Sequence, residues 1–562
     1  MRKKVVAFLL ASAMVFSTVA CGGNGNTTDN TDKNTTGSAA ENTTNDEQGD
    51  RSMYPGTEEE GAITFNLTSE PPDMCSLTTT DVTSGNVLRQ IMEPLVCLDE
   101  HDEPTEGVAT KWKVSDDGLI YTFTLREGMK WTNGEPVTAH DFEYAWKKIL
   151  NPETAAEYAY FAYVLKNGEA YNNGNCSADE VGVKATSDYE LVVTLENPTA
   201  YFVKSLSFYS FYPLNQKAYE EYGDKYGTDA DKIVTNGAFT MKEWKHQNEI
   251  VLEKNPDFYN ADKVGVDKIY MLMMENTSTT LNSFQTGEAD IVGLSGDQSD
   301  LLESEGFDVF NYNDGSCAYL EYNLNNKYLA NENLRLALGA AIDTSVIAEN
   351  VIKNGTKAPT GFTPEAILGL EKPFPEEVGQ TIIGYNPDKA KELYDKAVEE
   401  LGEIPKLTII TDDGDAAAKS CTFIQEEIKK NLGLEVEIQQ MTFKNRLARM
   451  TAQDFDIVMA LWGPDYNDPM TFLDLWETNG GNNHTGWSNK EYDELLSKIR
   501  KEVDEKERMN YLYEAEKLVM AEQPVSPIYW RSKAYAVSDK IESGVVRTAF
   551  QDINLKYVQL RK

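Results

Sequence analysis

A short, nearly unbroken apolar run at residues 455–462, followed directly by Gly463 and Pro464, most constrains the fold. The run has the length of a strand, and its continuous apolarity predicts burial on both faces, as in a parallel sheet. Proline lacks the amide hydrogen that a central strand donates, so the strand should end there. Asp468 and Pro469 then predict the start of a helix, with the aspartate as its N-cap.

The residues before this run alternate predicted helices and strands. A helix is predicted after Asn386, a strand at 407–411, a helix at 416–431, a strand at 434–440 and a helix at 442–450. This order predicts parallel strands joined by right-handed crossovers. Ligands of open α/β sheets bind beyond the carboxyl ends of the strands. Asp465, just past the last strand, is therefore expected at the ligand edge.

The chemistry around Asp465 suits a ligand ammonium group. A carboxylate between Trp462 and Tyr466 offers charge for the cation and aromatic walls for the rest of the ligand. The alternative is that Asp465 only caps backbone N–H groups in a turn, and local sequence leaves the two about even. The predicted place at the sheet edge favours the ligand interpretation.

Composition excludes several classes of protein. The chain has 562 residues, 41% of them hydrophobic, so it is long enough for more than one core. Its formal net charge of −40 argues against nucleic acid and against a basic patch for an anionic membrane. Neither the six cysteines nor the four histidines have metal-site spacing, and phosphate-loop, nucleophile-elbow and dinucleotide motifs are missing. We therefore expect no catalytic residues, no metal and no cofactor.

Residues 1–20 are typical of an export signal. Three basic residues precede the apolar stretch 5–19, which is short for a membrane span. Small residues then lead to Cys21, and the sequence resembles a bacterial lipobox, although Thr18 stands where leucine is usual. We expect Cys21 to be the lipidated N-terminus of the mature chain; an ordinary secretory signal is the alternative.

Residues 21–57 are predicted to form a disordered linker. They are rich in Asn, Thr, Gly and acidic residues and hold almost no large apolar side chain, so they cannot offset the entropy of ordering. A lipidated cysteine on such a linker predicts an extracytoplasmic protein anchored to the bacterial cell membrane.

The first half of the folded region has a β-rich pattern. Residues 62–67 alternate as a strand, and 111–125 predict a hairpin around an Asp-Asp-Gly turn. Thr138 and Asp141 predict a capping box at the start of a helix. Because β-rich organisation precedes α/β organisation, the chain should form at least two lobes.

Five segments together resemble the extracytoplasmic oligopeptide- and dipeptide-binding proteins of ABC importers. They occur in the family's order at 111–126, 130–142, 235–239, 287–290 and 462–469. The resemblance implies an α/β, two-lobed periplasmic-binding-protein-like fold of the large type II class with a small insert domain. The N-terminal lobe would comprise 58–92, 217–316 and 533–562, the insert 93–216, and the C-terminal α/β lobe 317–532.

The resemblance also implies the site residues. Asp465 matches the aspartate that pairs with a peptide's α-ammonium, and Thr80, Asp81 and Val82 match the edge that pairs with the peptide backbone. The arginines that some members use for the peptide carboxylate are not reproduced, since Met459 stands at one such place; Arg531 and Arg449 are the candidates to substitute. The remaining expected peptide-binding residues are Trp462, Gly463, Pro464, Tyr466, Tyr158, Phe443, Tyr529 and Trp530.

The resemblance implies a monomeric, lipid-anchored receptor that captures oligopeptides between closing lobes and delivers them to the permease subunits of an ABC importer. The alternatives are a receptor for another small solute, such as a sugar or a nickel complex, and a peptide pheromone receptor. A secreted hydrolase is the alternative from a different class. Peptide length and the recognition of the peptide's carboxyl end stay open.

Overall fold

The largest sheet has ten strands. In the computed structural model, which describes residues 59–561, the order is β14-β13-β15-β12-β16-β11-β1-β10-β9-β8. The bounds in that order are Val436–Met441, Leu407–Asp412, Ile457–Trp462, Val309–Tyr322, Val525–Val537, Ile291–Leu294, Ala62–Asn66, Lys268–Leu272, Glu249–Lys254 and Phe239–Lys245. Cys21 and the predicted export signal and linker lie outside the described residues.

The helices lie on both sides of this sheet or beside it. In chain order they are α1 Val82–Ile91, α2 Ala139–Ile149, α3 Gly168–Asn172, α4 Phe202–Ser205, α5 Gln216–Tyr222, α6 Thr277–Gln285, α7 Gly296–Ser304, α8 Glu332–Ala340, α9 Thr344–Val346, α10 Phe374–Val378, α11 Pro387–Leu401, α12 Asp415–Leu432, α13 Phe443–Thr451, α14 Met470–Leu473, α15 Lys490–Ile499 and α16 Glu505–Glu522. Within the described part of the chain, none of them is long and apolar enough to cross a bilayer.

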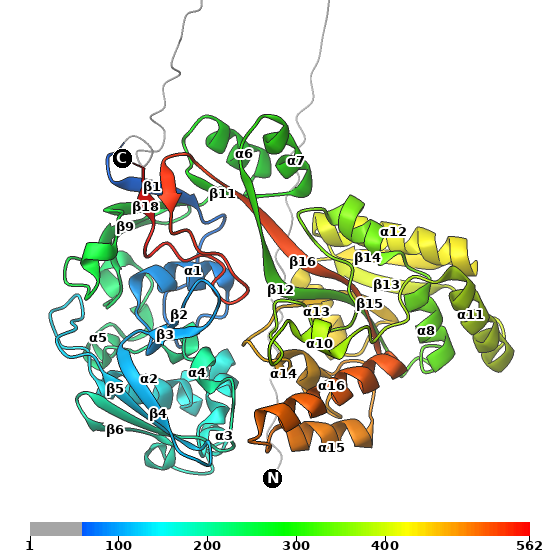
Figure 1. The fold of residues 1–562 in the computed structure, drawn as a ribbon, viewed down its shortest axis with the longest axis horizontal. Helices are drawn as coiled ribbons and strands as arrows, with labels where there is room; N and C mark the ends of the chain where they lie inside the picture. The colour runs from blue at the N-terminus through cyan, green and yellow to red at the C-terminus, as the bar shows by residue number, and fades with distance from the viewer. Residues whose placement is uncertain (1–58, 562) are drawn as a thin grey trace, which may run out of the picture. The chain divides into compact units, whose positions relative to one another are not determined.

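Two long strands, β12 and β16, connect the two ends of the sheet (Figure 1). They pair antiparallel, with 14 and 13 residues. Their register shifts between Asn313 and Cys317, where Gly315 has φ +72°. The shift marks a bulge, which bends a strand and raises its local twist.

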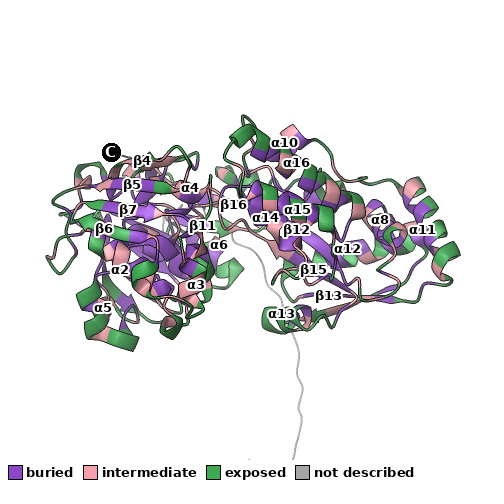
Figure 2. Ribbon diagram, turned by 90° about the horizontal axis from the view of Figure 1, so that it is seen from below, coloured by how far each residue is buried: buried purple, intermediate pink, exposed green. Residues whose placement is uncertain are grey.

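The two lobes have separate cores. One large cluster joins β1 and α1 to the insert region, to residues as far as Ile291 and to the C-terminal residues Ile541, Ile553, Leu555 and Val558. At the other end, alternate residues of β12 enter different clusters: Cys317 and Tyr319 face one, and Ala318 and Leu320 face the other. A strand presents successive side chains to opposite faces, so this end of the sheet is covered on both sides. Figure 2 shows the buried strands between more exposed helices.

The insert region contains a four-stranded antiparallel sheet in the order β4-β5-β7-β6. The strands are β4 Ala109–Val114, β5 Ile120–Leu125, β6 Val183–Ser187 and β7 Glu190–Thr194. Two further sheets have two strands each. One pairs β2 Val96–Leu98 with β3 Pro104–Glu106, and the other pairs β17 Ile541–Ser543 with β18 Gln559–Leu560 near the C-terminus. The predicted hairpin is confirmed as β4–β5, and the predicted capping box at α2 is present.

The predicted β-α-β-α-β order is confirmed at the C-terminal end. β13 pairs parallel with both β14 and β15. The expectation of an all-parallel environment for 455–462 is only half right, because β15 pairs antiparallel with β12 on its other side. A long strand that returns from the other lobe fills that position, and local periodicity carries no signal for it.

The helix predicted after Pro469 is shorter than expected. α14 is a single turn that continues as the 3₁₀ segment Asp474–Trp476, and Pro469, not Asp468, is its N-cap. Asp468 still accepts the amide of Met470 at 3.0 Å, but its carboxylate mainly binds the buried guanidinium of Arg508. A buried ion pair therefore replaces the simple cap.

Candidate functional site

Asp465 lies three residues beyond β15, at the carboxyl end of that strand. Its amide donates to Thr471 Oγ1 at 3.0 Å, which holds the loop against α14. Among the described residues, the Asp465 carboxylate has no hydrogen bond and no ion pair. The side chain therefore does not cap its own turn, and its charge is available to a ligand.

Two neighbouring carboxyl groups share this environment. Burial raises the pKa of Asp465 to about 7, and the charge of Asp474 adds to the shift. Burial likewise raises the pKa of Asp474 to about 7, and Tyr466 donates its hydroxyl to Asp474 Oδ2 at 3.4 Å. A cation placed beside Asp465 would favour the ionised form and offset its desolvation.

A cavity of about 330 Å³ opens on one side of Asp465. Its walls come from α1, from residues 158 and 204–209 of the insert region, from the bulge of β12, from β16, from residues 549–552 and from the loop after β15. The expected site residues that line it are Thr80, Val82, Tyr158, Gly463, Pro464, Asp465, Tyr466 and Arg531. We call this the main cavity.

A second hollow of about 280 Å³ lies on the other side of Asp465. Trp462, Tyr160, Tyr201 and Asp474 line it together with Asp465. Arg500 is also in its wall, but both of its terminal nitrogens bind the Glu477 carboxylate, at 2.8 and 2.6 Å. Asp465 thus stands between two hollows with aromatic walls.

Tyr158 links the insert region to the edge segment before α1. Its hydroxyl donates to the carbonyl oxygen of Thr80 at 3.2 Å. Burial, with a contribution from the Asp465 charge, raises the Tyr158 pKa to about 12, so the phenol stays protonated at neutral pH. Asp81 is not part of the cavity wall, and its carboxylate caps α1 by accepting the Ser84 amide at 2.8 Å.

Three other expected residues lie away from the main cavity. Phe443 is 59% exposed at the start of α13, with its ring under Arg446. Tyr529 and Trp530 are buried in β16, one in each of the two clusters that cover the sheet. Their side chains pack within the C-terminal lobe because consecutive strand residues point to opposite faces.

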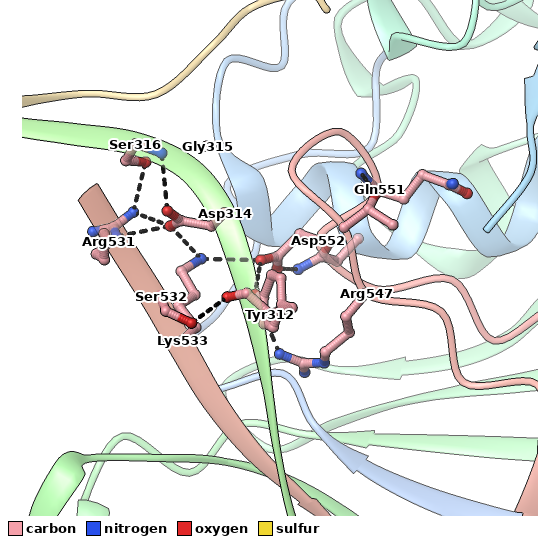
Figure 3. Close-up of polar contacts among 12 residues, drawn as sticks. Tyr312, Asp314, Gly315, Ser316, Arg531, Ser532, Lys533, Arg547, Gln551 and Asp552 are labelled. Atoms are coloured by element: carbon pink, nitrogen blue, oxygen red, sulfur yellow. Dashed lines mark hydrogen bonds and ion pairs between the residues drawn. The ribbon is translucent and has the colours of Figure 1, made fainter. Parts of the chain in front are cut away.

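Arg531 reaches the cavity wall with its charge already paired. It binds Asp314 through Nε at 2.7 Å and donates to Ser316 Oγ at 3.2 Å, as Figure 3 shows. Lys533 bridges Asp314 and Asp552, at 3.6 and 3.0 Å. Burial opposes ionisation of Asp314, but these two cations hold its pKa below the ordinary value. This network occupies the bulge between the two connecting strands.

Sequence reasoning missed four residues of this region. Asp474 lies on the segment predicted as a helix after Pro469, so its place near Asp465 could have been predicted from the sequence. The prediction used only the apolar face of that segment. Tyr201, Asp314 and Arg89, which also lines the main cavity, had no sequence signal, because their contacts with Tyr466, Arg531 and Phe550 join residues distant in sequence. Arg449, a candidate for carboxylate binding, is paired with Asp454 at 3.1 Å and does not line the cavities described above.

The fold and the cavity define a two-lobed solute-binding protein. Residues 103–484 match the model of the bacterial extracellular solute-binding proteins, family 5 (middle region). The oligopeptide-binding protein OppA of Bacillus subtilis is 38% identical over 503 residues, covering 86% of this chain and 90% of that protein. The dipeptide-binding protein DppE of the same organism is 35% identical over 477 residues, covering 84% and 87%. The chain therefore belongs to family 5 of the bacterial extracellular solute-binding proteins.

Solved structures of other proteins are similar to this chain over most of its length. A structure described as Listeria monocytogenes OppA bound to peptide has a TM-score of 0.75 at 34% identity and covers 89% of this chain and 99% of that one. The pheromone receptor PrgZ has a TM-score of 0.77 at 30% identity with the same coverage. These similarities confirm the expected two-lobed type II fold.

Proposed function

We propose that this protein is an extracytoplasmic receptor that captures oligopeptides and passes them to the permease of an ABC importer. The observation that carries the proposal is the Asp465 carboxylate, which lies in the wall of the main cavity and has no ion-pair partner among residues 59–561. Relatives named as oligopeptide- and dipeptide-binding proteins support the same ligand class.

The proposed binding mode places the peptide's α-ammonium on Asp465. Such an ammonium has a pKa near 8 and is charged at neutral pH. Breaking a buried pair of this kind by removing one partner typically costs about 3–5 kcal/mol. The backbone of the segment from Thr80 to Val82 would pair with the peptide as an added strand, which gives affinity without reading side chains.

We further propose the domain limits that the resemblance implies: an N-terminal lobe of 58–92, 217–316 and 533–562, an insert of 93–216, and a C-terminal lobe of 317–532. β12 and β16 support this division because they are the long strands that run between the two cores. Bending at their bulge would open and close the main cavity.

The anchor and the monomeric state are also proposals. Lipidation of Cys21 after removal of the export signal would hold the receptor at the membrane, and intact-mass measurement of the membrane-extracted protein tests it. We propose no catalytic activity, and a bound peptide recovered uncut after prolonged incubation is the corresponding test.

A pheromone receptor is the second candidate function, supported by the likeness to PrgZ. It uses the same cavity and differs in selectivity. A nutrient receptor would bind many unrelated short peptides with similar affinity, whereas a pheromone receptor would prefer one sequence. Mass spectrometry of peptides that copurify from the native host separates the two.

Calorimetry with a short peptide and its N-acetylated form tests the main proposal. Acetylation should weaken binding to the natural protein by about two to four decades, from the cost of an unpaired buried charge. Asp465→Asn should bind the free peptide weakly and lose the distinction between the two forms. Asp454→Asn, on an exposed loop, is the control. Equal affinity of the natural protein for both forms would contradict the role of Asp465.

A further inference from the structure

A second cavity of about 300 Å³ adjoins the main cavity, and residues of both the N-terminal lobe and the insert line it. It lies between α1, the β2–β3 hairpin and the C-terminal segment 544–557, and Figure 1 shows this red segment beside the blue α1. Four residues line both cavities: Arg89, Leu98, Ser207 and Phe550. We call the second one the rear cavity.

Arg89 stands in the wall that the two cavities share. Its Nη1 donates to Asn86 Oδ1 at 3.2 Å and its Nη2 to the carbonyl oxygen of Phe550 at 3.3 Å. Both acceptors are neutral, and no carboxylate of the described residues lies within ion-pair distance of this guanidinium. The side chain is thus held in place by its neighbours while its charge stays uncompensated by a direct partner.

Every other cation in the two walls is already paired with a carboxylate. Arg531 and Lys533 bind Asp314, and Lys533 also binds Asp552. Lys204 pairs with Glu103 at 2.9 Å. In the rear cavity, the buried Lys556 pairs with the fully buried Glu93. Arg89 is therefore the cation of these walls that a ligand anion can neutralise at the lowest cost.

Three acids also contribute to the rear wall, and two of them are engaged. Asp99 accepts the amides of His101 and Glu103 through Oδ1, at 2.8 and 2.9 Å. Glu106 binds Arg126 at 2.8 Å. Glu100 is exposed at the rim, where solvent screens its charge. None of them is an ion-pair partner of Arg89.

We propose that the rear cavity receives the carboxyl end of the bound peptide and that Arg89 pairs with the carboxylate. The inference rests on the proposed function, because Asp465 must first fix the amino end in the main cavity. An extended chain with its ammonium there carries its opposite charge at the far end, and Arg89 stands where the main cavity gives way to the rear one. A guanidinium suits this task because it binds a carboxylate with two parallel hydrogen bonds.

The proposal identifies the substrate as a peptide with both termini free. It also assigns the neutral side chains of the rear wall, Leu98, Tyr212 and Phe550 among them, to the last residues of the peptide. The two arginines considered from sequence would have no such role, since Arg531 is paired with Asp314 and Arg449 with Asp454.

Calorimetry with matched peptides, carrying a free carboxylate or a carboxamide at the C-terminus, tests the proposal. Amidation should weaken binding to the natural protein at least tenfold, which is about 1.4 kcal/mol. In Arg89→Gln the free acid should bind as weakly as the amide, so the ratio falls to about one, while Arg89→Lys should retain part of it. Arg449→Gln, an arginine outside both cavities, should keep the full ratio. An unchanged ratio in Arg89→Gln would overturn the proposal.

The N-acetylated peptide separates this proposal from the proposed function. If the natural protein binds no peptide, or ignores acetylation, the function itself fails; if acetylation matters and amidation does not, only the assignment of Arg89 fails. Should Arg89→Gln not fold, Thr105→Trp provides a second test, because Thr105 lines only the rear cavity of the two. Filling that cavity should weaken long peptides at least tenfold and leave dipeptides unaffected; equal binding of long peptides would overturn the proposal.

Discussion

Tyr201 and Tyr466 stack face to face, with ring centroids 4.0 Å apart and planes inclined by 9°. Tyr201 precedes α4 in the insert region, and Tyr466 follows Asp465 in the loop after β15. The pair therefore joins the two sides of the hollow that contains Asp465 and Asp474. Residues far apart in the chain meet here, and a ligand on Asp465 would lie beside their contact.

Loss of this stack should speed the release of peptide. Aromatic pairs contribute about 0.5–1.5 kcal/mol beyond their buried area, so Tyr201→Ala should weaken binding about two- to tenfold. Most of the change should appear in the dissociation rate, which stopped-flow displacement measures. Tyr144→Ala removes a comparable ring from the pair Tyr144–Tyr219, away from the site, and should leave that rate unchanged. Equal rates in both variants would contradict the prediction.

Peptide affinity should depend on the ionisation of Asp465. Its pKa is raised to about 7, so below pH 7 the carboxyl is increasingly protonated and cannot pair with the ammonium. Above about pH 8 the peptide's own α-amino group loses its proton. Affinity should therefore be highest between about pH 7 and 8 and fall up to tenfold per unit below pH 7. Calorimetry across this range measures it, and Asp465→Asn should remove the acid limb.

The empty protein should lose stability as the pH rises. Asp474, like Asp465, has a native pKa near 7, whereas an unfolded aspartate titrates near 4. Between these values the native state binds more protons than the unfolded state, so the free energy of unfolding falls with rising pH. Asp474→Asn should flatten this slope and raise stability at pH 8 by about 1–3 kcal/mol. Urea midpoints measure it, and Asp413→Asn on an exposed loop should retain the slope.

The local sequence pattern predicted much of the fold. The alternation of helices and strands after Asn386 predicted the parallel group of β13, β14 and β15, because amphipathic periodicity is a property of neighbouring residues. The same order placed Asp465 at the end of a buried strand. The Asp-Asp-Gly turn predicted the β4–β5 hairpin for a similar reason.

The parts that were not predictable depend on contacts distant in sequence. Nothing near residue 455 indicates that β12 lies beside β15. β12 pairs with β15 on one side and with the other long strand, β16, on its other side. Arg531 looked available for a ligand, but Asp314, more than two hundred residues earlier, neutralises it. Asp468 looked like a helix cap, but Arg508 from α16 holds its carboxylate. In each case a tertiary partner decides the role of a charged residue.

The Asp468–Arg508 pair should be important for both stability and binding. Both side chains are 8% exposed, and the guanidinium makes two hydrogen bonds, of 2.7 and 2.9 Å. Arg508→Met leaves a buried carboxylate without its cation, which typically costs about 3–5 kcal/mol. Because Asp468 is three residues from Asp465, peptide affinity should fall as well. Urea unfolding and calorimetry measure the two effects.

Lys490→Met is the control for that variant. Lys490 and Glu494 form an exposed pair on α15, and such pairs contribute about 0–1 kcal/mol. A loss of stability in Arg508→Met no larger than in this control would mean that the buried pair is not stabilising the loop.

Gly315 should be required for the position of Asp465. Its φ of +72° is strained for other residues, and a Cβ there would lie 2.7 Å from Pro464 Cγ and 3.0 Å from Ala549 Cβ. In Gly315→Ala the backbone strain alone costs about 1–2 kcal/mol, and the ring of Pro464 must move. Since Pro464 directly precedes Asp465, the variant should both unfold at lower urea concentration and discriminate less between free and N-acetylated peptide. Gly293→Ala on β11, where a Cβ meets open space at ordinary φ, should change neither property. Full discrimination by Gly315→Ala would mean that the bulge of β12 does not position the loop that carries the aspartate.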